Sequence, residues 1–370
     1  MSQSRTARTG LSTALLAAVV TFAALVVGAY APLAQSLART QAQSQAQTQA
    51  QSLTEANTAL QAGEADRALA LLATAIASGP QSGPGAAQAQ NLLCRVRLTL
   101  EQWDAAATGC EQAARLDAEN SDYHLWLGRT LGEKASRASF LTAFSLAKRT
   151  RAEFEEAVRL NPRNVEALAD LGDFYRQAPG VVGGGMDKAE GIAADLDKVD
   201  QARADELRGR IAEQQKNFPA AETEFKKMVA AEAHPALGWS ALASFYARRQ
   251  RFDDMESAVR SVLTEALRDK NAGVAFYDGA GLLTESNRDP ALAVTMLDDY
   301  LAGSSKTEEA PAFIAHLRLA RLKAQLGDPA AAERERAAAL ALAREYKPAQ
   351  DFKPQSRGPQ QVTTHQQAKL

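Results

Sequence analysis

One pattern of small and bulky residues recurs along this chain at an interval of 34 residues and constrains its fold more than any other feature. The clearest copy consists of Trp239, Leu242, Ala243 and Tyr246. Gly209 stands 34 residues before Ala243. A small residue lets two antiparallel helices cross closely, and bulky residues fill the space toward the next pair. Because one helix pair cannot bury its own apolar face, the pattern predicts a stack of pairs.

The small residue of the first helix can be followed through about eight units. In chain order these residues are Ala56, Cys94, Gly128, Gly172, Gly209, Ala243, Gly279 and Ala320. Pro162 ends the second helix of the third unit, because proline cannot continue a helix. Three residues depart from the pattern and affect local packing rather than architecture: His124, Arg208 and Met255.

The pattern resembles the tetratricopeptide repeat, whose unit of about 34 residues carries W-x2-L-G-x2-Y in its first helix. Leu168, Leu171, Gly172 and Tyr175 fit this motif. The resemblance covers residues 53–346. It implies an all-α fold, a right-handed α-solenoid of stacked antiparallel hairpins with a concave groove lined by first helices. It also implies an elongated monomer that binds other proteins and is not an enzyme.

Two breaks in the period are the parts most specific to this chain. Gly128 and Gly172 are 44 residues apart, and 133–160 contains neither Pro nor Gly. We therefore expect both helices of the third hairpin to be long and to project beyond the stack. Gly172 and Gly209 are 37 residues apart, and a Gly-rich run at 178–185 supplies the extra length.

The Gly-rich run is a candidate loop for binding, because backbone amides at a helix start can hold phosphate. However, no Gly-Lys-Ser/Thr follows it, and Asp187 at the expected helix start would repel an anion. The run is interpreted as an inserted turn in the fourth hairpin. A loop that contacts a partner is the alternative.

Three apolar residues lie in the lengthened part of the third hairpin: Phe140, Leu141 and Phe144. Their spacing places them on one side of a helix. Either they pack against the other helix of the hairpin, or they form an exposed anchor for a protein partner. On the second interpretation, Phe140 and Phe144 are partner-binding residues.

Cys94 and Cys110 are the only cysteines, and the expected hairpin brings them level with each other. In an oxidising compartment they could form a disulfide that pins the two helices together. Alternatively, both are buried free thiols that act as small apolar side chains. A metal site is not expected, since no third ligand lies at suitable spacing.

The register predicts that the first helices present charges of both signs to the groove. The candidate partner-binding residues are Arg95, Arg129, Asp173, Arg176, Glu206, Arg210, Glu213 and Arg248, with Ser244 beside them. Some tetratricopeptide domains bind an acidic C-terminus through a Lys and Asn pair on the first helix. The matching positions hold Asn91/Arg95, Leu125/Arg129, Ala169/Asp173 and Glu206/Arg210, so that clamp is absent here.

The remaining composition argues against several classes of protein. The formal net charge is -2, which is too balanced for a nucleic-acid binder or for recruitment to a membrane by a basic patch. The histidines are scattered at His124, His234, His316 and His365, and no catalytic motif surrounds them. We therefore expect no cofactor and no metal.

Both ends of the chain differ from the repeats. Residues 1–30 combine Arg5 and Arg8 with an apolar run from Leu11 to Val27, typical of a cleaved signal peptide or of a retained signal anchor. Residues 31–52 contain a Gln/Ala-rich stretch interpreted as a flexible linker. The solenoid is expected over 53–347, and residues 348–370 are expected to be disordered.

Together these patterns predict a non-catalytic interaction scaffold of the bacterial cell envelope that binds a peptide or partner helix in its groove. The expected location is the periplasm, or the inner membrane facing the periplasm if the anchor is retained. An accessory subunit of an envelope transport or assembly complex is one alternative. A small-molecule binding protein that uses the groove and the Gly-rich loop is another.

Overall fold

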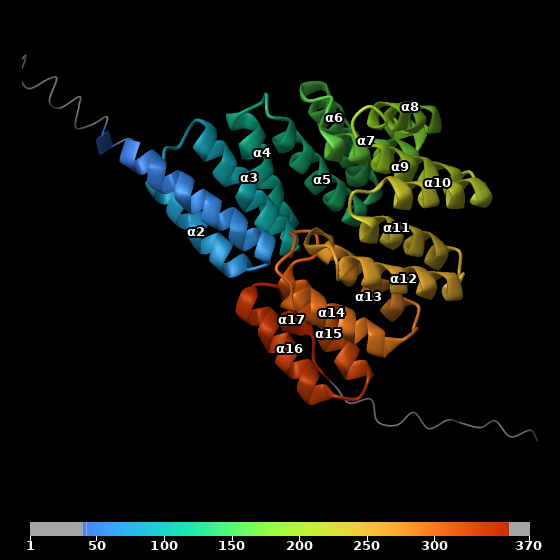
Figure 1. The fold of residues 1–370 in the computed structure, drawn as a ribbon. Coiled ribbons are helices and arrows are strands. Elements are labelled where there is room, and N and C mark those ends of the chain that lie inside the picture. The colour runs from blue at the N-terminus through green and yellow to red at the C-terminus, as the bar shows by residue number, and fades with distance from the viewer. Residues whose placement is uncertain (1–39, 42, 355–370) are drawn as a thin grey trace, which may run out of the picture.

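The chain is described by a computed structural model over residues 40–41 and 43–354, and all regular elements there are helical. The helices form eight successive antiparallel hairpins (Figure 1). The pairs are 43–62 with α2 (Ala65–Ser78), α3 (Pro84–Thr99) with α4 (Trp103–Leu116), α5 (Ser121–Arg137) with α6 (Phe140–Leu160), α7 (Val165–Gln177) with α8 (Met186–Leu196), α9 (Gln201–Gln214) with α10 (Phe218–Ala231), α11 (Pro235–Arg248) with α12 (Phe252–Ala266), α13 (Gly273–Glu285) with α14 (Pro290–Ala302), and α15 (Ala312–Gln325) with α16 (Pro329–Leu342). The predicted all-α stack of hairpins is therefore confirmed.

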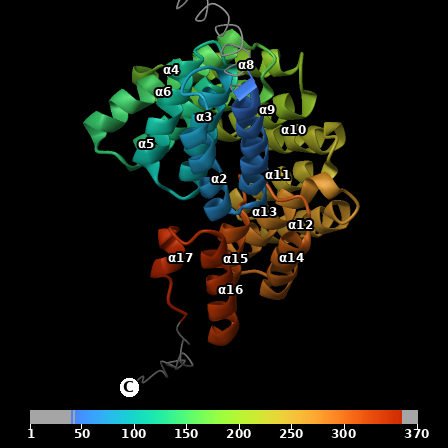
Figure 2. The ribbon, with the colours of Figure 1, turned by 90° about the vertical axis from the view of Figure 1, so that its left-hand side faces the viewer.

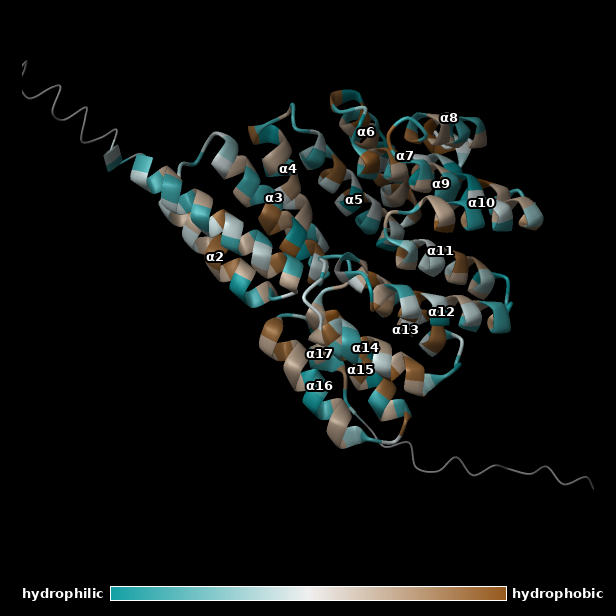
Figure 3. Ribbon diagram, viewed as in Figure 1, coloured by the Kyte–Doolittle hydropathy of each residue, from teal (hydrophilic) through white to brown (hydrophobic). Residues whose placement is uncertain are grey.

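Small residues stand where helices cross, as the repeat pattern predicts. A Cβ on Gly128 of α5 would collide with the ring of Phe154 on α6, and one on Gly172 would collide with Leu207. Ala243 and Ala320 are fully buried. The helices are amphipathic, and Figure 3 shows apolar and polar residues sharing each of them. Close crossing at the small residues thus lets each hairpin bury its apolar side against the next.

Hairpin three is longer than its neighbours. Helix α5 has 17 residues and α6 has 21, whereas α3 has 16 and α4 has 14. The start of α6 projects from the body, and Phe140 and Leu141 there are 83% and 80% exposed (Figure 2). The predicted lengthening is confirmed.

The predicted elongated shape is wrong, because the last hairpin returns to the first. Figures 1 and 2 both show the C-terminal helices α15 and α16 below the lower end of hairpin one. Phe313, Leu317 and Tyr346 from the C-terminal end share one buried cluster with Leu53 and Leu100 from the N-terminal end. The stack therefore closes on itself.

Polar contacts reinforce this closure. Glu308, between α14 and α15, accepts hydrogen bonds from Arg95 of α3 and from Gln61, the latter at 3.1 Å. The Tyr346 hydroxyl donates to Glu101 at 3.2 Å. A Cβ on Gly63 would collide with the backbone nitrogen of Ala312, so the two ends are in direct backbone contact. Closure was missed because it joins segments more than two hundred residues apart.

The flexible linker prediction is wrong over 43–52, which belongs to the first helix. Alanine and glutamine both favour helix, and here the helix packs against α2. Gln49 is 4% exposed and donates to the Ala75 carbonyl at 3.2 Å. Residues 31–39 and residue 42 lie outside the described residues.

The predicted disordered tail begins too early, because residues 347–351 form α17 (Lys347–Asp351). Ala349 is fully buried in the cluster that closes the stack. The polar composition of the C-terminal tail gives no sign that Ala349 packs into this cluster. Residues 355–370 are not among those the structure describes.

The described helices include none that is long and apolar enough to cross a membrane. The predicted signal peptide or anchor at residues 1–30 lies outside the described residues. Its role stays a prediction.

Cys94 of α3 and Cys110 of α4 form a disulfide in the structure, with their Cα atoms 5.2 Å apart. Both side chains are fully buried, and the Thr130 hydroxyl of α5 lies within 3.4 Å of the Cys94 sulfur. The bond therefore ties the two helices of hairpin two together at the point where hairpin three packs on them.

Replacing both cysteines (Cys94→Ala/Cys110→Ala) should lower the free energy of unfolding by about 2–4 kcal/mol, because the cross-link constrains the unfolded chain. Urea denaturation measures the loss, and a reducing agent should cause a similar loss in the unaltered protein. Thiol titration of unfolded, unreduced protein should find no free thiol. Two free thiols and no change in stability would contradict the bond.

Candidate functional site

The concave face contains a groove of about 1100 Å³. Its walls are the C-terminal parts of α3, α5 and α7, residues 143–154 of α6, and the turn η1 (Gly180–Val182). The remaining wall comes from residues 308–314, which reach the groove only because the stack closes. Hairpins two to four and the C-terminal end of the fold therefore build one site.

The groove has an apolar floor. It is formed mainly by Trp103, Trp126, Ala143, Ala147, Phe154, Phe174 and Val182. Two guanidinium groups lie close to the Trp126 ring, that of Arg95 4.9 Å and that of Arg129 4.8 Å from its centroid. Such stacking is attractive and holds the indole in place. The arrangement gives a fixed, flat apolar surface in the middle of the groove.

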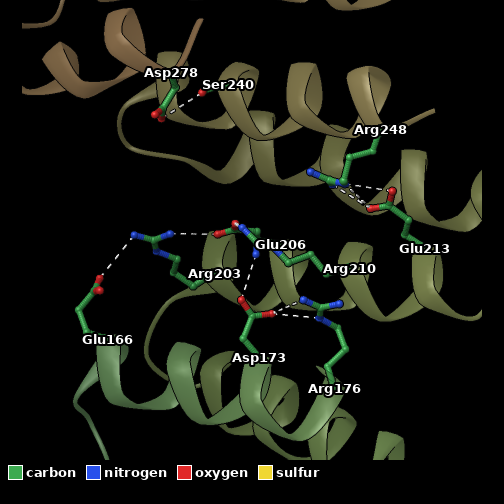
Figure 4. A network of polar contacts seen from close by, with 10 residues as sticks. All are labelled: Glu166, Asp173, Arg176, Arg203, Glu206, Arg210, Glu213, Ser240, Arg248 and Asp278. Carbon is green, nitrogen blue, oxygen red and sulfur yellow. Dashed lines mark hydrogen bonds and ion pairs between the residues drawn. The ribbon is translucent and has the colours of Figure 1, made fainter. Parts of the chain in front are cut away.

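A row of ion pairs joins the first helices along the concave face (Figure 4). Arg210 of α9 bonds to Asp173 of α7 at 3.0 Å and to Glu206 at 2.5 Å. Arg203 bonds to Glu206 at 3.0 Å and reaches Glu166 of α7 at 3.4 Å. Several of these pairs connect positions about one repeat apart. The charges therefore tie successive hairpins together.

The same arrangement continues at both ends of the row. Arg129 of α5 bonds to Asp170 of α7 at 2.5 Å and to Glu166 at 2.8 Å. Arg248 of α11 bonds to Glu213 of α9 at 2.8 Å. These contacts again span adjacent first helices.

The charged candidates predicted from the sequence all lie in these pairs. Arg95 pairs with Glu308, Arg176 with Asp173, and the others as described above. Their guanidinium groups are thus already neutralised. Ser244 lines a second hollow beside the row. The structure places the predicted charges on the concave face, and each already has a charged partner there, so a binding role for them stays a prediction.

Phe140 and Phe144 lie on α6 at the projecting end of hairpin three. Phe140 is exposed, whereas Phe144 is half-buried with the Lys148 ammonium 4.5 Å from its ring centroid. Neither residue lines the groove. The structure therefore separates them from the row of charges, and a binding role for them stays a prediction.

Glu206 is the most enclosed carboxylate of the row, with 9% of the residue exposed. Burial alone would raise its pKa, but the charges of Arg210 and Arg203 outweigh burial and hold the pKa below the ordinary value. The side chain therefore stays ionised at neutral pH and contributes to folding in that form.

Sequence reasoning missed Glu308, Glu309 and Asp278. Glu308 and Glu309 lie in a long connection between α14 and α15, and only closure carries them onto the concave face. Asp278 of α13 accepts a hydrogen bond from Ser240 at 3.4 Å (Figure 4). The surrounding protein removes much of its hydration and raises its pKa to about 6, although Arg318 acts in the opposite direction. No local signal in the sequence marks these acids.

The second hollow, of about 360 Å³, adjoins the groove. Its polar lining residues are Arg203, Glu206, Arg210, Glu232, Ser240, Ser244, Arg248, Asp278 and Glu309. Glu309 lines both the groove and this hollow. Of the acids that line the groove or the second hollow, Glu309 is therefore the only one that lines both.

The Gly-rich loop uses its backbone amides internally. The amide of Gly185 donates to the Tyr175 carbonyl at 2.8 Å, and that of Gly184 donates to Pro179 at 3.2 Å. Val182 is buried beside α6, and Lys188 donates to the Gly183 carbonyl. The loop thus forms a packed turn inside hairpin four. Its amides are not arranged to hold an anion.

Within the described ranges no group of three or more His, Cys, Asp or Glu side chains is placed to bind a metal ion. The three histidines there each contact a carboxylate: His124 with Glu153, His234 with Asp269 and His316 with Glu335. The contacts of His124 and His316 join the two helices of a hairpin, whereas His234 and Asp269 lie in the segments that precede α11 and η2.

Comparisons with known proteins agree with the hairpin architecture. Residues 53–117 match the family model described as tetratricopeptide repeat, so most of hairpin one and all of hairpin two carry such repeats. Repeats of this family generally mediate protein–protein contacts and are usually non-catalytic. No curated protein matches the chain.

Two repeat proteins are among the solved structures that this chain resembles. One is a thermophilic TPR protein of Thermus thermophilus, with 21% identity and a TM-score of 0.40 over 54% of this chain and 99% of that one. The other is a tetratricopeptide repeat protein of Parabacteroides merdae, with 14% identity and a TM-score of 0.36 over 72% and 100% of the two chains. Both likenesses are too distant to indicate a function.

The variant Glu206→Gln should lower the free energy of unfolding at pH 7 by about 1–3 kcal/mol, because two arginines lose their charged partner. Since the folded pKa of Glu206 lies below its unfolded value of 4.5, its stabilisation is present above pH 4.5. It is lost as pH falls through the lower folded pKa.

Urea denaturation at pH 7 and pH 3 measures this difference, with Glu119→Gln in the exposed α4–α5 loop as the control. The difference in free energy of unfolding between the two variants should be smaller at pH 3 than at pH 7. If the two variants differ in free energy of unfolding by the same amount at both pH values, or do not differ at pH 7, the ion pairs do not stabilise the fold.

Proposed function

We propose that this protein is a non-catalytic interaction scaffold of the bacterial cell envelope that binds a segment of another protein in its concave groove. The observation that carries the proposal is the groove itself, with its apolar floor and a wall supplied by the returning C-terminal hairpin. A groove with a fixed tryptophan and polar edges suits a protein segment.

The candidate contact residues change accordingly. Arg129, Arg176 and Arg210 hold the hairpins together, so they contribute to binding by shaping the face. The groove floor around Trp126 and Ala143 provides the contact area. Phe140 and Phe144 at the end of hairpin three offer a second surface outside the groove.

Export to the periplasm is part of the same proposal. It is supported by the signal-like pattern of residues 1–30 and by the Cys94–Cys110 disulfide, a bond that is rare in reducing compartments. If the N-terminal segment is retained, it would hold the repeats at the inner membrane, facing the periplasm.

A photo-reactive amino acid placed at Ala143 should crosslink in living cells to a discrete set of proteins, because this side chain lines the groove. The matched control is the same substitution at Ala70, which is exposed on α2 and does not line the groove. Crosslinked products are identified by mass spectrometry. Equal crosslinking at both positions, or none at Ala143, would contradict binding in the groove.

A further inference from the structure

We propose that the groove takes an amphipathic segment whose apolar side faces Trp126 and whose polar side carries lysine or arginine. This inference names the chemistry of the partner and rests on the proposed function. Three observations carry it: the charges that line the groove, the partners those charges already have, and the composition of the floor.

The charges that line the groove are mostly negative. Six carboxylates contribute to its lining, from Glu101, Glu133, Asp170, Asp173, Glu308 and Glu309. Only two guanidinium groups do so, those of Arg129 and Arg137. Four of these acids, Glu133, Asp170, Asp173 and Glu308, already pair with arginines. The excess therefore rests on Glu101 and Glu309, which have no ion pair among the described residues and would attract a cationic partner and repel an anionic one.

The positive charges on this face are already paired. Arg129 is held by Asp170 and Glu166, and Arg137 by Glu133. Arg95, just beyond the lining, is held by Glu308. A carboxylate on a partner would have to displace one of these acids to reach a cation. An acidic peptide therefore finds no available positive group in the groove.

Glu309 is in the opposite situation. No ion pair or hydrogen bond joins its side chain to any described residue, although it lies where the groove meets the second hollow. Asp278 in that hollow has only the Ser240 hydroxyl as a hydrogen-bond donor within the described part of the chain. An ammonium or guanidinium group entering between these acids would gain partners without breaking an existing pair.

The floor explains the apolar half of the proposed segment. Trp126, Phe154 and Ala147 form a continuous wall with the buried residue Thr150, which is 3% exposed. The Thr150 hydroxyl has no hydrogen-bond partner among the described residues. That oxygen is enclosed and offers no contact to an incoming segment, so the wall is apolar where Trp126, Phe154 and Ala147 lie.

Three synthetic peptides of about 15 residues test the proposal: one with leucines on one helical face and lysines on the other, one with glutamates in place of the lysines, and a scrambled lysine peptide. Fluorescence anisotropy measures their binding to the full-length protein. The lysine peptide should bind at least about tenfold more tightly than the glutamate peptide, and less tightly as salt rises.

Variants locate the binding. Glu309→Gln should lower the affinity for the lysine peptide by about two- to fivefold, because one exposed ion pair is lost. Glu119→Gln should leave the affinity unchanged. Ala147→Arg should abolish binding by placing a cation in the floor. Circular dichroism establishes that each variant is folded, and Glu309→Gln keeps the test valid if Ala147→Arg does not fold.

The outcomes separate this inference from the proposed function. If the glutamate or scrambled peptide binds as well as the lysine peptide, or if Glu309→Gln has no effect, the inference is wrong. If none of the peptides binds while Ala143 still crosslinks in cells, the groove binds proteins of another chemistry. If Ala143 does not crosslink either, the proposed function fails as well.

Discussion

The structure depends on the packing of its last hairpin against its first two. Phe313 and Tyr346 pack edge to face, with ring centroids 4.9 Å apart, inside a cluster that also contains Leu60 and Leu72. An open repeat array leaves an apolar face at each end and needs polar caps. Here Phe313, Leu317 and Tyr346 pack into the cluster of hairpins one and two, so each end buries part of the other.

Closure also creates the site. Residues 308–314 form one wall of the groove only because α15 lies against hairpins one and two. The same contact brings Glu308 to Arg95 and leaves Glu309 facing the concave space. The fold therefore supplies both the apolar floor and the excess of acid from segments that are distant in sequence. Loss of this contact would therefore remove one wall of the groove.

The ion pairs of the concave face have a different role from the one that their position suggests. A single exposed pair contributes little, on the order of 0–1 kcal/mol. Here Arg203 and Arg210 share Glu206, and each reaches the neighbouring first helix as well. A shared, partly enclosed row fixes the register between hairpins. Charge on a concave face is therefore weak evidence of a ligand when every cation already has an acid.

Much of this fold could be predicted from local spacing. The positions of Gly128 and Gly172, the long third hairpin and the charged face follow from a repeat that each hairpin obeys separately. Closure could not be predicted in this way. It depends on small rotations that accumulate over eight hairpins and on inserted residues such as those near Val182, and no pattern in the sequence encodes their sum. Glu309 belongs to the site for the same reason, so it was missed together with the closure.

The most direct test of the account is whether the two ends meet in solution. The Asp66 carboxylate accepts a hydrogen bond from the backbone amide of Arg344 at 3.3 Å, so the variant Asp66→Cys/Arg344→Cys places two thiols close together. Mild oxidation followed by peptide mass spectrometry measures the cross-link, and Asp66→Cys/Arg260→Cys serves as the distant control. A closed stack predicts rapid, nearly complete linkage of residues 66 and 344 within one chain. Linkage no faster than in the control would contradict closure and, with it, the groove.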